Sequence, residues 1–157
     1  MRKLILLAMA VMPATASASN IPTTIYVQNS DVKSDDCLSK DKKHDLCQFA
    51  KGIQETLAPN LPRALSSKLT INAVAAIGKR VITYAVWPQT KAQMDAYVKS
   101  LGVSQSQYDQ GLLQVTKRMV CDPKAMLEFI QQGGEIEYQY RTADAFLDAS
   151  ALVTECP

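Results

Sequence analysis

The chain has 157 residues, of which 47% are hydrophobic and 20% are charged, with 17 Lys and Arg against 15 Asp and Glu. This composition is that of an ordinary globular protein, and it excludes a disordered, collagen-like or low-complexity chain. A single domain is expected at this length.

The first 18 residues have the pattern of a signal peptide. Met1-Arg2-Lys3 is a positive start, residues 4–12 are an apolar run, and Ala16-Ser17-Ala18 offers the small residues that signal peptidase accepts. Such a run is too short to cross a bilayer, which takes about 20 residues. We therefore predict cleavage after Ala18, export to the periplasm and no membrane-spanning segment.

The charge balance changes once the leader is removed. The remaining 139 residues carry 15 basic and 15 acidic side chains. No excess positive charge is left to bind nucleic acid, so nucleic acid is not expected as a partner. Residues 19–36 become polar after Ile25-Tyr26-Val27 and are predicted to form a loosely held N-terminal arm, followed by a domain over residues 37–157.

The first predicted helix begins near Lys40 and is ended by Pro59 and Pro62. His44, the only histidine, lies near its start among charged residues and is expected to face solvent. Hydrophobic residues recur at the spacing of one helix face. These residues are Leu46, Phe49, Ala50, Ile53 and Leu57.

Two runs with the composition of strands follow the helix. Residues 69–74 and 81–87 are rich in β-branched and aromatic side chains, which favour a pleated, half-buried surface. Gly78-Lys79 lies between them at the position of a turn, and Pro88 ends the second run. The pattern predicts an antiparallel hairpin.

Three helices are predicted after this hairpin. Thr90 is suited to cap the first, and Ser104 with Gln107 forms a capping-box pattern at the start of the second. Asp122-Pro123 predicts the start of the third, with Asp as the cap and Pro in the first turn. Gly133-Gly134 ends it.

The last part of the chain contains a second predicted hairpin. Residues 135–141 alternate, so that Ile136, Tyr138 and Tyr140 face the core and the intervening polar residues face water. Residues 142–145 form the turn, and residues 146–154 return as the partner strand. Together the elements predict a single α+β domain, in which an antiparallel sheet of two hairpins packs against three to four helices.

The four cysteines are expected to form two disulfides, because an exported chain is exposed to an oxidising compartment. Three pairings are possible. We favour Cys37–Cys47, which closes a short loop, and Cys121–Cys156, which attaches the end of the chain to the end of a long helix.

A metal site is the alternative use of these cysteines. Cys37, His44 and Cys47 have the spacing C-x6-H-x2-C, with Asp35 and Asp36 beside them. Structural zinc sites more often contain closely paired cysteines, so we predict neither a metal nor another cofactor. Catalysis by a nucleophile with a histidine base would need His44, whose charged surroundings are typical of a surface residue.

Glu135 and Glu137 lie on the same predicted strand face. A carboxylate pair is the usual apparatus of glycoside hydrolysis, but strand alternation accounts for these two residues without any chemistry. The chain also lacks the common nucleotide, calcium and metalloprotease motifs. We therefore predict no catalytic residues, and we take Glu135, Glu137 and Arg141 as a candidate protein interface.

The segment from about residue 47 to residue 156 resembles the small exported bacterial proteins grouped as quorum-sensing-regulated virulence factors. The resemblance rests on a strand of the type Val81-Ile82-Thr83-Tyr84, a helix finishing at Met119-Val120-Cys121-Asp122-Pro123, a Gly-Gly-x-Ile-x-Tyr-x-Tyr-Arg strand and a terminal cysteine. It supports the pairing of Cys121 with Cys156 and implies no catalytic residue. The chain departs from the pattern at Thr142-Ala143-Asp144-Ala145, where a turn containing glycine is usual.

These observations predict an exported, non-catalytic periplasmic protein that binds another protein of the cell envelope. The resemblance implies an association with virulence or with a secretion machine. The alternative hypothesis is a periplasmic inhibitor or immunity protein that neutralises a toxin or hydrolase.

Overall fold

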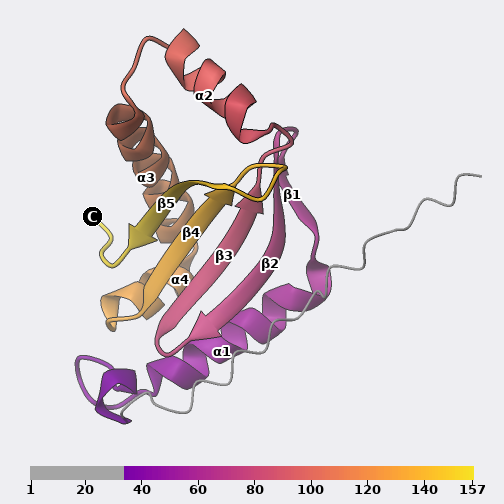
Figure 1. The fold of residues 1–157 in the computed structure, drawn as a ribbon. Helices are drawn as coiled ribbons and strands as arrows, with labels where there is room; N and C mark the ends of the chain where they lie inside the picture. Colours follow the sequence, from indigo (N-terminus) through magenta and orange to yellow (C-terminus); the bar gives the residue numbers. More distant parts are fainter. Residues whose placement is uncertain (1–33) are drawn as a thin grey trace, which may run out of the picture.

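The computed structural model of the chain describes residues 34–157, which form one five-stranded sheet and four α-helices (Figure 1). The predicted leader and nearly all of the predicted arm lie outside these residues. The strands are β1 (Arg63–Ser66), β2 (Leu69–Ile77), β3 (Arg80–Val86), β4 (Glu135–Arg141) and β5 (Leu147–Val153). The helices are α1 (Leu46–Leu57), α2 (Lys91–Ser100), α3 (Gln105–Cys121) and α4 (Lys124–Gln131), with 3-10 turns at Ser34–Cys37 and Ala58–Asn60.

The predicted α+β class is confirmed, and so are both hairpins, β2–β3 and β4–β5. The two hairpins meet through a parallel pair, however, in which Arg80 lies beside Glu135 and Val86 beside Arg141. Helices α2, α3 and α4 carry the chain back along the sheet, so β4 runs in the same direction as β3. A parallel pair requires a crossover of this kind. The predicted antiparallel arrangement therefore holds for three of the four strand pairs.

Strand β1 is an element that the sequence pattern did not predict. Three of its four residues pair with the start of β2, with Arg63 opposite Ile71. Three of the four are exposed, so the strand has no alternation of buried and exposed residues. Pairing with β2, and not its own side chains, makes this segment a strand.

Two helices begin later than their sequence patterns suggested. Helix α1 begins at Leu46, because Asp45 is extended and its carboxylate accepts hydrogen bonds from the N–H groups of Cys47 and Gln48. Asp122 does not cap α4, since it keeps a helical conformation at the end of α3, and the extended Pro123 takes the cap position. The predicted caps of α2 and α3 are both confirmed as capping boxes.

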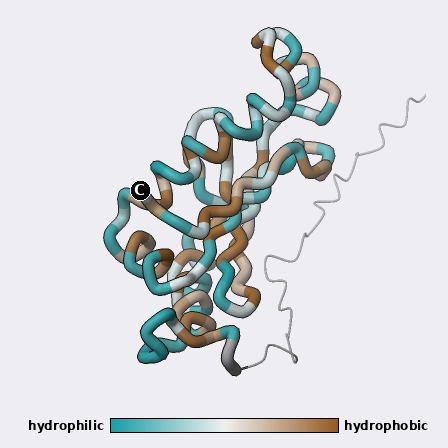
Figure 2. The backbone as a smooth tube through the Cα atoms, turned by 90° about the vertical axis from the view of Figure 1, so that its left-hand side faces the viewer, coloured by the Kyte–Doolittle hydropathy of each residue, from teal (hydrophilic) through white to brown (hydrophobic). Residues whose placement is uncertain are grey.

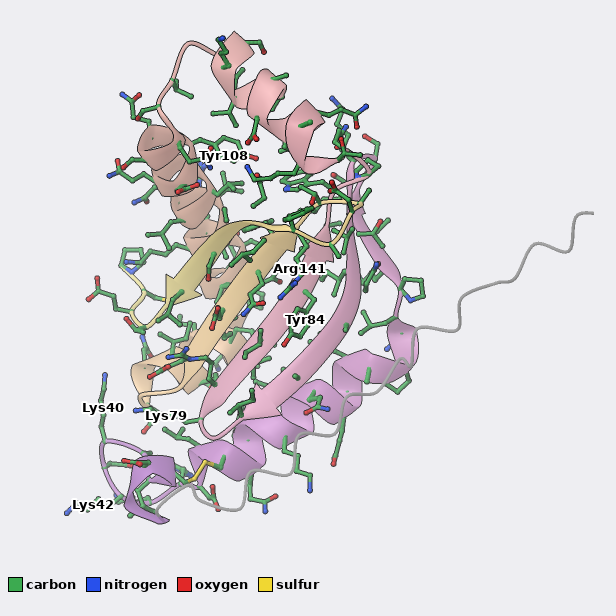
Figure 3. The ribbon with its side chains drawn as sticks, in the orientation of Figure 1. Lys40, Lys42, Lys79, Tyr84, Tyr108 and Arg141 are labelled. Carbon is green, nitrogen blue, oxygen red and sulfur yellow. A yellow bond between two sulfur atoms is a disulfide. The ribbon has the colours of Figure 1, made fainter. Side chains whose placement is uncertain are left out.

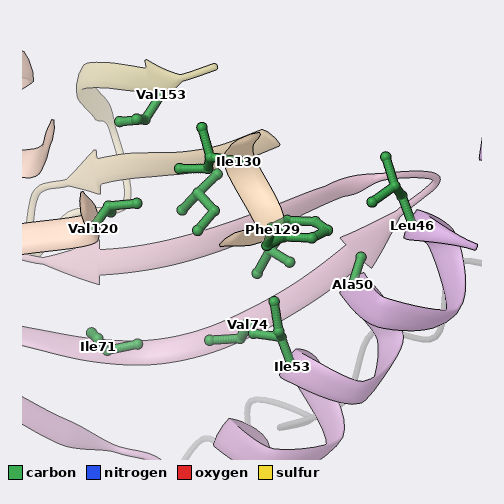
Figure 4. Packing of buried hydrophobic residues seen from close by; sticks show 11 residues of the cluster. Leu46, Ala50, Ile53, Ile71, Val74, Val120, Phe129, Ile130 and Val153 are labelled. Atoms are coloured by element: carbon green, nitrogen blue, oxygen red, sulfur yellow. The ribbon is translucent and has the colours of Figure 1, made fainter. Parts of the chain in front are cut away.

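Helices α1, α3 and α4 pack on the same face of the sheet and form the main core with it (Figure 4). Figure 2 shows the hydrophobic segments gathered along the central strands. Phe49 was expected on the buried face of α1 but is 45% exposed, with its ring stacked on Phe129 of α4. The core consists of Leu46, Ala50, Ile53, Ile71, Val74, Val81, Val120, Phe129, Ile130, Ile136 and Val153.

The turn between α4 and β4 needs both of its glycines. Gly133 has a φ of +104°, which L side chains rarely adopt. Gly134 is required for another reason, because a Cβ atom there would lie 2.5 Å from ring carbons of the buried Phe129. The turn therefore lets β4 start directly against the core. At the next turn Ala145 has a φ of +68°, at the place where the resemblance led us to expect a glycine.

Both predicted disulfides are confirmed. Cys37 pairs with Cys47, with a Cα–Cα distance of 5.1 Å, and Cys121 pairs with Cys156, with a Cα–Cα distance of 5.7 Å. The first closes the loop before α1, and the second holds the residues after β5 to the end of α3. Of the helices described, none combines the length and hydrophobicity that crossing a bilayer requires.

A buried hydrogen bond links α3 to the sheet. The hydroxyl oxygens of Thr116 and Tyr140 are 2.6 Å apart, and both residues are shielded from solvent. Because the Thr116 hydroxyl donates to the carbonyl oxygen of Leu112, the Tyr140 hydroxyl donates to Thr116. Each hydroxyl therefore has a partner inside the core.

Replacing Thr116 with Val is expected to lower the free energy of unfolding by about 1–3 kcal/mol, because the buried Tyr140 hydroxyl loses its acceptor. Adding Tyr140→Phe removes the unpaired hydroxyl as well, so the double variant should recover most of that loss. Urea unfolding of the three proteins measures the difference. Equal stability of Thr116→Val and the wild type would show that the hydroxyl pair does not stabilise the fold.

Candidate functional site

The sheet has one face that no helix or strand of residues 34–157 covers, because α1, α3 and α4 all pack on the other face (Figure 1). Successive strand residues point to opposite faces, so the uncovered face carries the residues that alternate with the core positions. We call this surface the open sheet face. It comprises Arg80, Ile82, Tyr84, Glu135, Glu137, Gln139, Arg141 and Ser150.

Arg80 joins the two glutamates of the open sheet face. The parallel register places it beside Glu135, and its Nε donates to Glu135 Oε2 at 2.7 Å. Its Nη1 also donates to Glu137 Oε2 at 3.2 Å. One guanidinium therefore pairs with both carboxylates, and Lys79 Nζ lies 3.8 Å from Glu135 Oε1 as a second cation.

The network continues to the other end of β4. Gln139 Nε2 and Ser150 Oγ both donate to Glu137 Oε1 at 3.0 Å. Arg141 Nη2 donates to Gln139 Oε1 at 3.0 Å, and the Arg141 guanidinium lies 5.6 Å from the centre of the Tyr84 ring (Figure 3). A continuous line of paired polar groups thus runs along the strand from Arg80 to Arg141.

This network sets the protonation state of Glu137. Burial opposes its ionisation, but hydrogen bonds from Gln139 and Ser150 and the charge of Arg80 outweigh that effect and hold the pKa of the Glu137 carboxyl below its usual value. A carboxyl group with a lowered pKa is a poor general acid at neutral pH. The geometry therefore suits Glu135 and Glu137 to ionic pairing better than to glycoside hydrolysis.

The open sheet face has the composition of a recognition surface. Its charges are already held in position, so binding would cost little side-chain entropy. Tyr84 and Arg141 belong to residue types that contribute strongly at protein interfaces. The surface can therefore offer positioned charges and an aromatic side chain to a partner.

The structure brings the three predicted interface residues together, since Glu135, Glu137 and Arg141 all lie on the open sheet face. The sequence analysis missed Arg80 and Gln139, which connect them. The alternation of residues along β4 does indicate that Gln139 lies on the same face as Glu137 and Arg141. No signal in the sequence pointed to Arg80, because its contact with β4 depends on the parallel pairing of distant segments.

The structure uses the two cysteines of the metal alternative in a disulfide. His44 is exposed in the loop before α1. The sulfur atoms of Cys37 and Cys47 are bonded to each other, and a disulfide is not a thiolate ligand. A carboxylate oxygen of Asp45 lies within 4.8 Å of both sulfurs, but Asp45 caps α1.

Most of the aromatic residues on or next to β3 and β4 pack in the core. Tyr140 is fully buried, and its ring stacks on Trp87 at 5.9 Å. Tyr138 is half-buried beside it, with ring centres 6.1 Å apart. Tyr84 differs from these three residues, since it lies on the open sheet face under Arg141.

Comparison with known proteins identifies the fold. No family model matches the chain, and no significant match was found among curated proteins. A presumed secreted protein from Pseudomonas aeruginosa has a similar structure, with a TM-score of 0.55 and 12% identity over 69% of this chain and 88% of that one.

Two pilotins of type II secretion systems are also similar in structure. For AspS from Vibrio cholerae the TM-score is 0.52, with 21% identity over 73% of this chain and 94% of the pilotin. For EpsS from Vibrio vulnificus the TM-score is 0.53, with 16% identity over 69% of this chain and 87% of the pilotin. At these identities the similarity establishes a shared fold.

Proposed function

We propose that this chain is an exported, non-catalytic accessory protein of the bacterial envelope, which binds another protein through the open sheet face and serves a secretion system. The observation that carries the proposal is the uncovered sheet face with its preformed line of charges. A face of this kind is suited to a protein partner that presents complementary charges.

Three further observations support the proposal. Two disulfides are typical of proteins that function in an oxidising compartment, and the N-terminal sequence has the pattern of a signal peptide. The fold is shared with two secretion-system pilotins. The resemblance to quorum-sensing-regulated virulence factors implies an association with virulence or with a secretion machine, and no specific observation favours the inhibitor alternative.

Charge inversion on the open sheet face tests the interface. The mature protein, carrying Glu135→Lys together with Arg141→Glu, is used as bait in periplasmic extracts of its native host. We expect a secretion-machine protein to be captured by the wild type and its capture to fall at least about tenfold with the variant, because complementary charges become repulsive.

The matched control inverts exposed charges on the helical side, with Lys51→Glu on α1 and Glu128→Lys on α4. Near-ultraviolet circular dichroism shows whether each bait is folded. The proposal fails if the wild type captures nothing above background. It also fails if a folded open-face variant retains the partner as well as the control does.

A further inference from the structure

A second surface feature lies on the helical side of the molecule, away from the open sheet face. It is an apolar groove of about 390 Å³ between α1 and α4, and we call it the helix groove. Its volume falls within the range of ligand-binding clefts. Among the described residues that line it, none is charged. They are Phe49, Gly52, Ile53, Thr56 and Leu57 of α1, with Ala125 and Met126 of α4.

The helix groove is exposed although its walls are mostly apolar. Phe49 remains 45% exposed even with its ring stacked on Phe129. Gly52 and Ala125 are exposed as well, and Gly52 widens the groove, because a Cβ atom there would have no neighbour within 4 Å. A contiguous apolar hollow marks an interaction site more often than a single exposed hydrophobic residue does. An occupant should therefore supply apolar side chains.

The chain carries such side chains shortly before its described part. Residues 19–33 of the predicted mature protein are mostly polar, and their longest apolar run is Ile25-Tyr26-Val27. Residues 19–30, which contain this run, have no charged side chain. A neutral apolar segment matches an uncharged apolar groove, because contact between them removes apolar area of both from water.

A disulfide fixes the end of the arm beside the helix groove. The 3-10 turn Ser34–Cys37 lies next to the start of α1 (Figure 1). Cys37 is bonded to Cys47 in the first turn of that helix, with a Cα–Cα distance of 5.1 Å. The near end of the groove is formed by Phe49, two residues after Cys47. The far end, at Leu57, is about 15 Å from Cys47 along the helix axis, at 1.5 Å per residue.

The arm is long enough to reach the whole helix groove. Val27 precedes Cys37 by 10 positions, and an extended chain spans up to about 33 Å over that length. This reach covers the length of the groove and the passage around α1, since a helix is about 10 Å across. A tether of this length also gives the segment an effective concentration of about millimolar. The arm is therefore better placed than a free partner or a second copy.

We propose that the helix groove binds the chain's own N-terminal arm, with Ile25, Tyr26 and Val27 in contact with the apolar walls of α1 and α4. One side of the groove faces solvent, so the backbone groups of the bound segment keep hydrogen bonds to water. In this state the arm covers an apolar surface that otherwise favours association. The groove and the open sheet face lie on opposite sides of the sheet, so this proposal does not rest on the function proposed for that face.

Cleavage of the mature protein by chymotrypsin after Tyr26 tests the proposal, because a bound segment is cleaved only when it is released. The synthetic peptide of residues 19–33 gives the rate for a free arm, and mass spectrometry identifies the product that begins at Val27. We expect the wild type to be cleaved there at least about tenfold more slowly than the peptide. Cleavage as fast as in the peptide would overturn the proposal.

Two variants of the helix groove show whether docking is the cause of this protection. Gly52→Leu fills the groove from α1, and Ala125→Glu introduces a carboxylate from α4. Both positions are exposed, so neither change disturbs the core. Each variant should be cleaved after Tyr26 about tenfold faster than the wild type, because the arm is released into the cleavable state.

Gly111→Leu on α3 and Ala96→Glu on α2 are the matched controls, since they make the same changes at exposed helix positions outside the groove. A Cβ atom at Gly111 also has no neighbour within 4 Å. Both controls should be cleaved at the rate of the wild type. Near-ultraviolet circular dichroism confirms that all four variants fold. The proposal is wrong if folded groove variants are cleaved no faster than their controls.

Light scattering after gel filtration, at two protein concentrations, separates binding within one chain from exchange between two copies. We expect a monomer at both concentrations, because the tether favours the chain's own arm. A wild-type dimer that becomes a monomer with Gly52→Leu would assign the groove to the arm of a second copy and would overturn the proposal.

Discussion

Replacing both Cys121 and Cys156 with Ser is expected to lower the free energy of unfolding by about 2–5 kcal/mol, the usual effect of losing a native disulfide. The bridge joins residues 35 positions apart, and the intervening chain contains α4 and the hairpin β4–β5. Without it the unfolded chain gains the freedom of a long loop, for which chain entropy predicts about 4 kcal/mol. The residues after β5 would also lose their attachment to α3.

The other disulfide provides the matched comparison. Cys37 and Cys47 are 10 positions apart, so replacing both with Ser should cost about 1 kcal/mol less, because a shorter loop restricts the unfolded chain less. Equilibrium unfolding in guanidinium chloride measures both proteins. If the loss is no greater at Cys121–Cys156 than at Cys37–Cys47, the loop entropy of the long bridge is not what stabilises the domain.

Replacing Phe129 with Ala is expected to lower the free energy of unfolding by about 3–5 kcal/mol, the range for large core side chains. Phe129 is only 2% exposed and lies in the main core between α4 and the sheet. Its ring stacks on Phe49 at 5.2 Å and fills the space above Gly134. Truncation would therefore leave a cavity bounded by α1, α4 and the start of β4.

Phe146→Ala is the matched control, because the same change is made where the ring is 59% exposed. Its effect should stay within about 0.5 kcal/mol, as for most surface substitutions. Thermal and urea unfolding of the two variants measure the contrast. Similar losses at the two positions would mean that the packing of Phe129 contributes nothing beyond that of a surface ring.

Features that depend on residues close together in the chain could be predicted from the sequence. Capping at Thr90 and Ser104 was predictable, because a cap and its partner are three residues apart in the chain. The hairpin β4–β5 was predictable as well, since alternation shows which strand residues are buried. The same alternation placed Glu135, Glu137 and Arg141 on one face.

Features that depend on distant partners were not predictable. Strand β1 forms because it pairs with the edge of β2. Its own residues show no alternation of buried and exposed side chains. The contact of Arg80 with Glu135 and Glu137 needs the parallel register of β3 and β4, whose paired residues are 55 positions apart. The ladder of β4 and β5 has an irregularity that leaves Asp148 of β5 without a partner in β4, and this is likewise a property of two strands together.

The sequence by itself therefore determined the α+β class, the short disulfide loop Cys37–Cys47 and the wet face of β4, because periodicity, caps and close cysteine spacing act over short stretches of chain. Only the tertiary structure decided that the two hairpins join through a parallel strand pair and that every core helix packs on one face of the sheet. It also decided that Arg80 links the two glutamates of the open sheet face. The physical reason is that strands can satisfy their backbone hydrogen bonds in several orders and directions, whose stabilities differ only slightly. The choice among those orders is made by the packing of the whole core, which no local pattern contains.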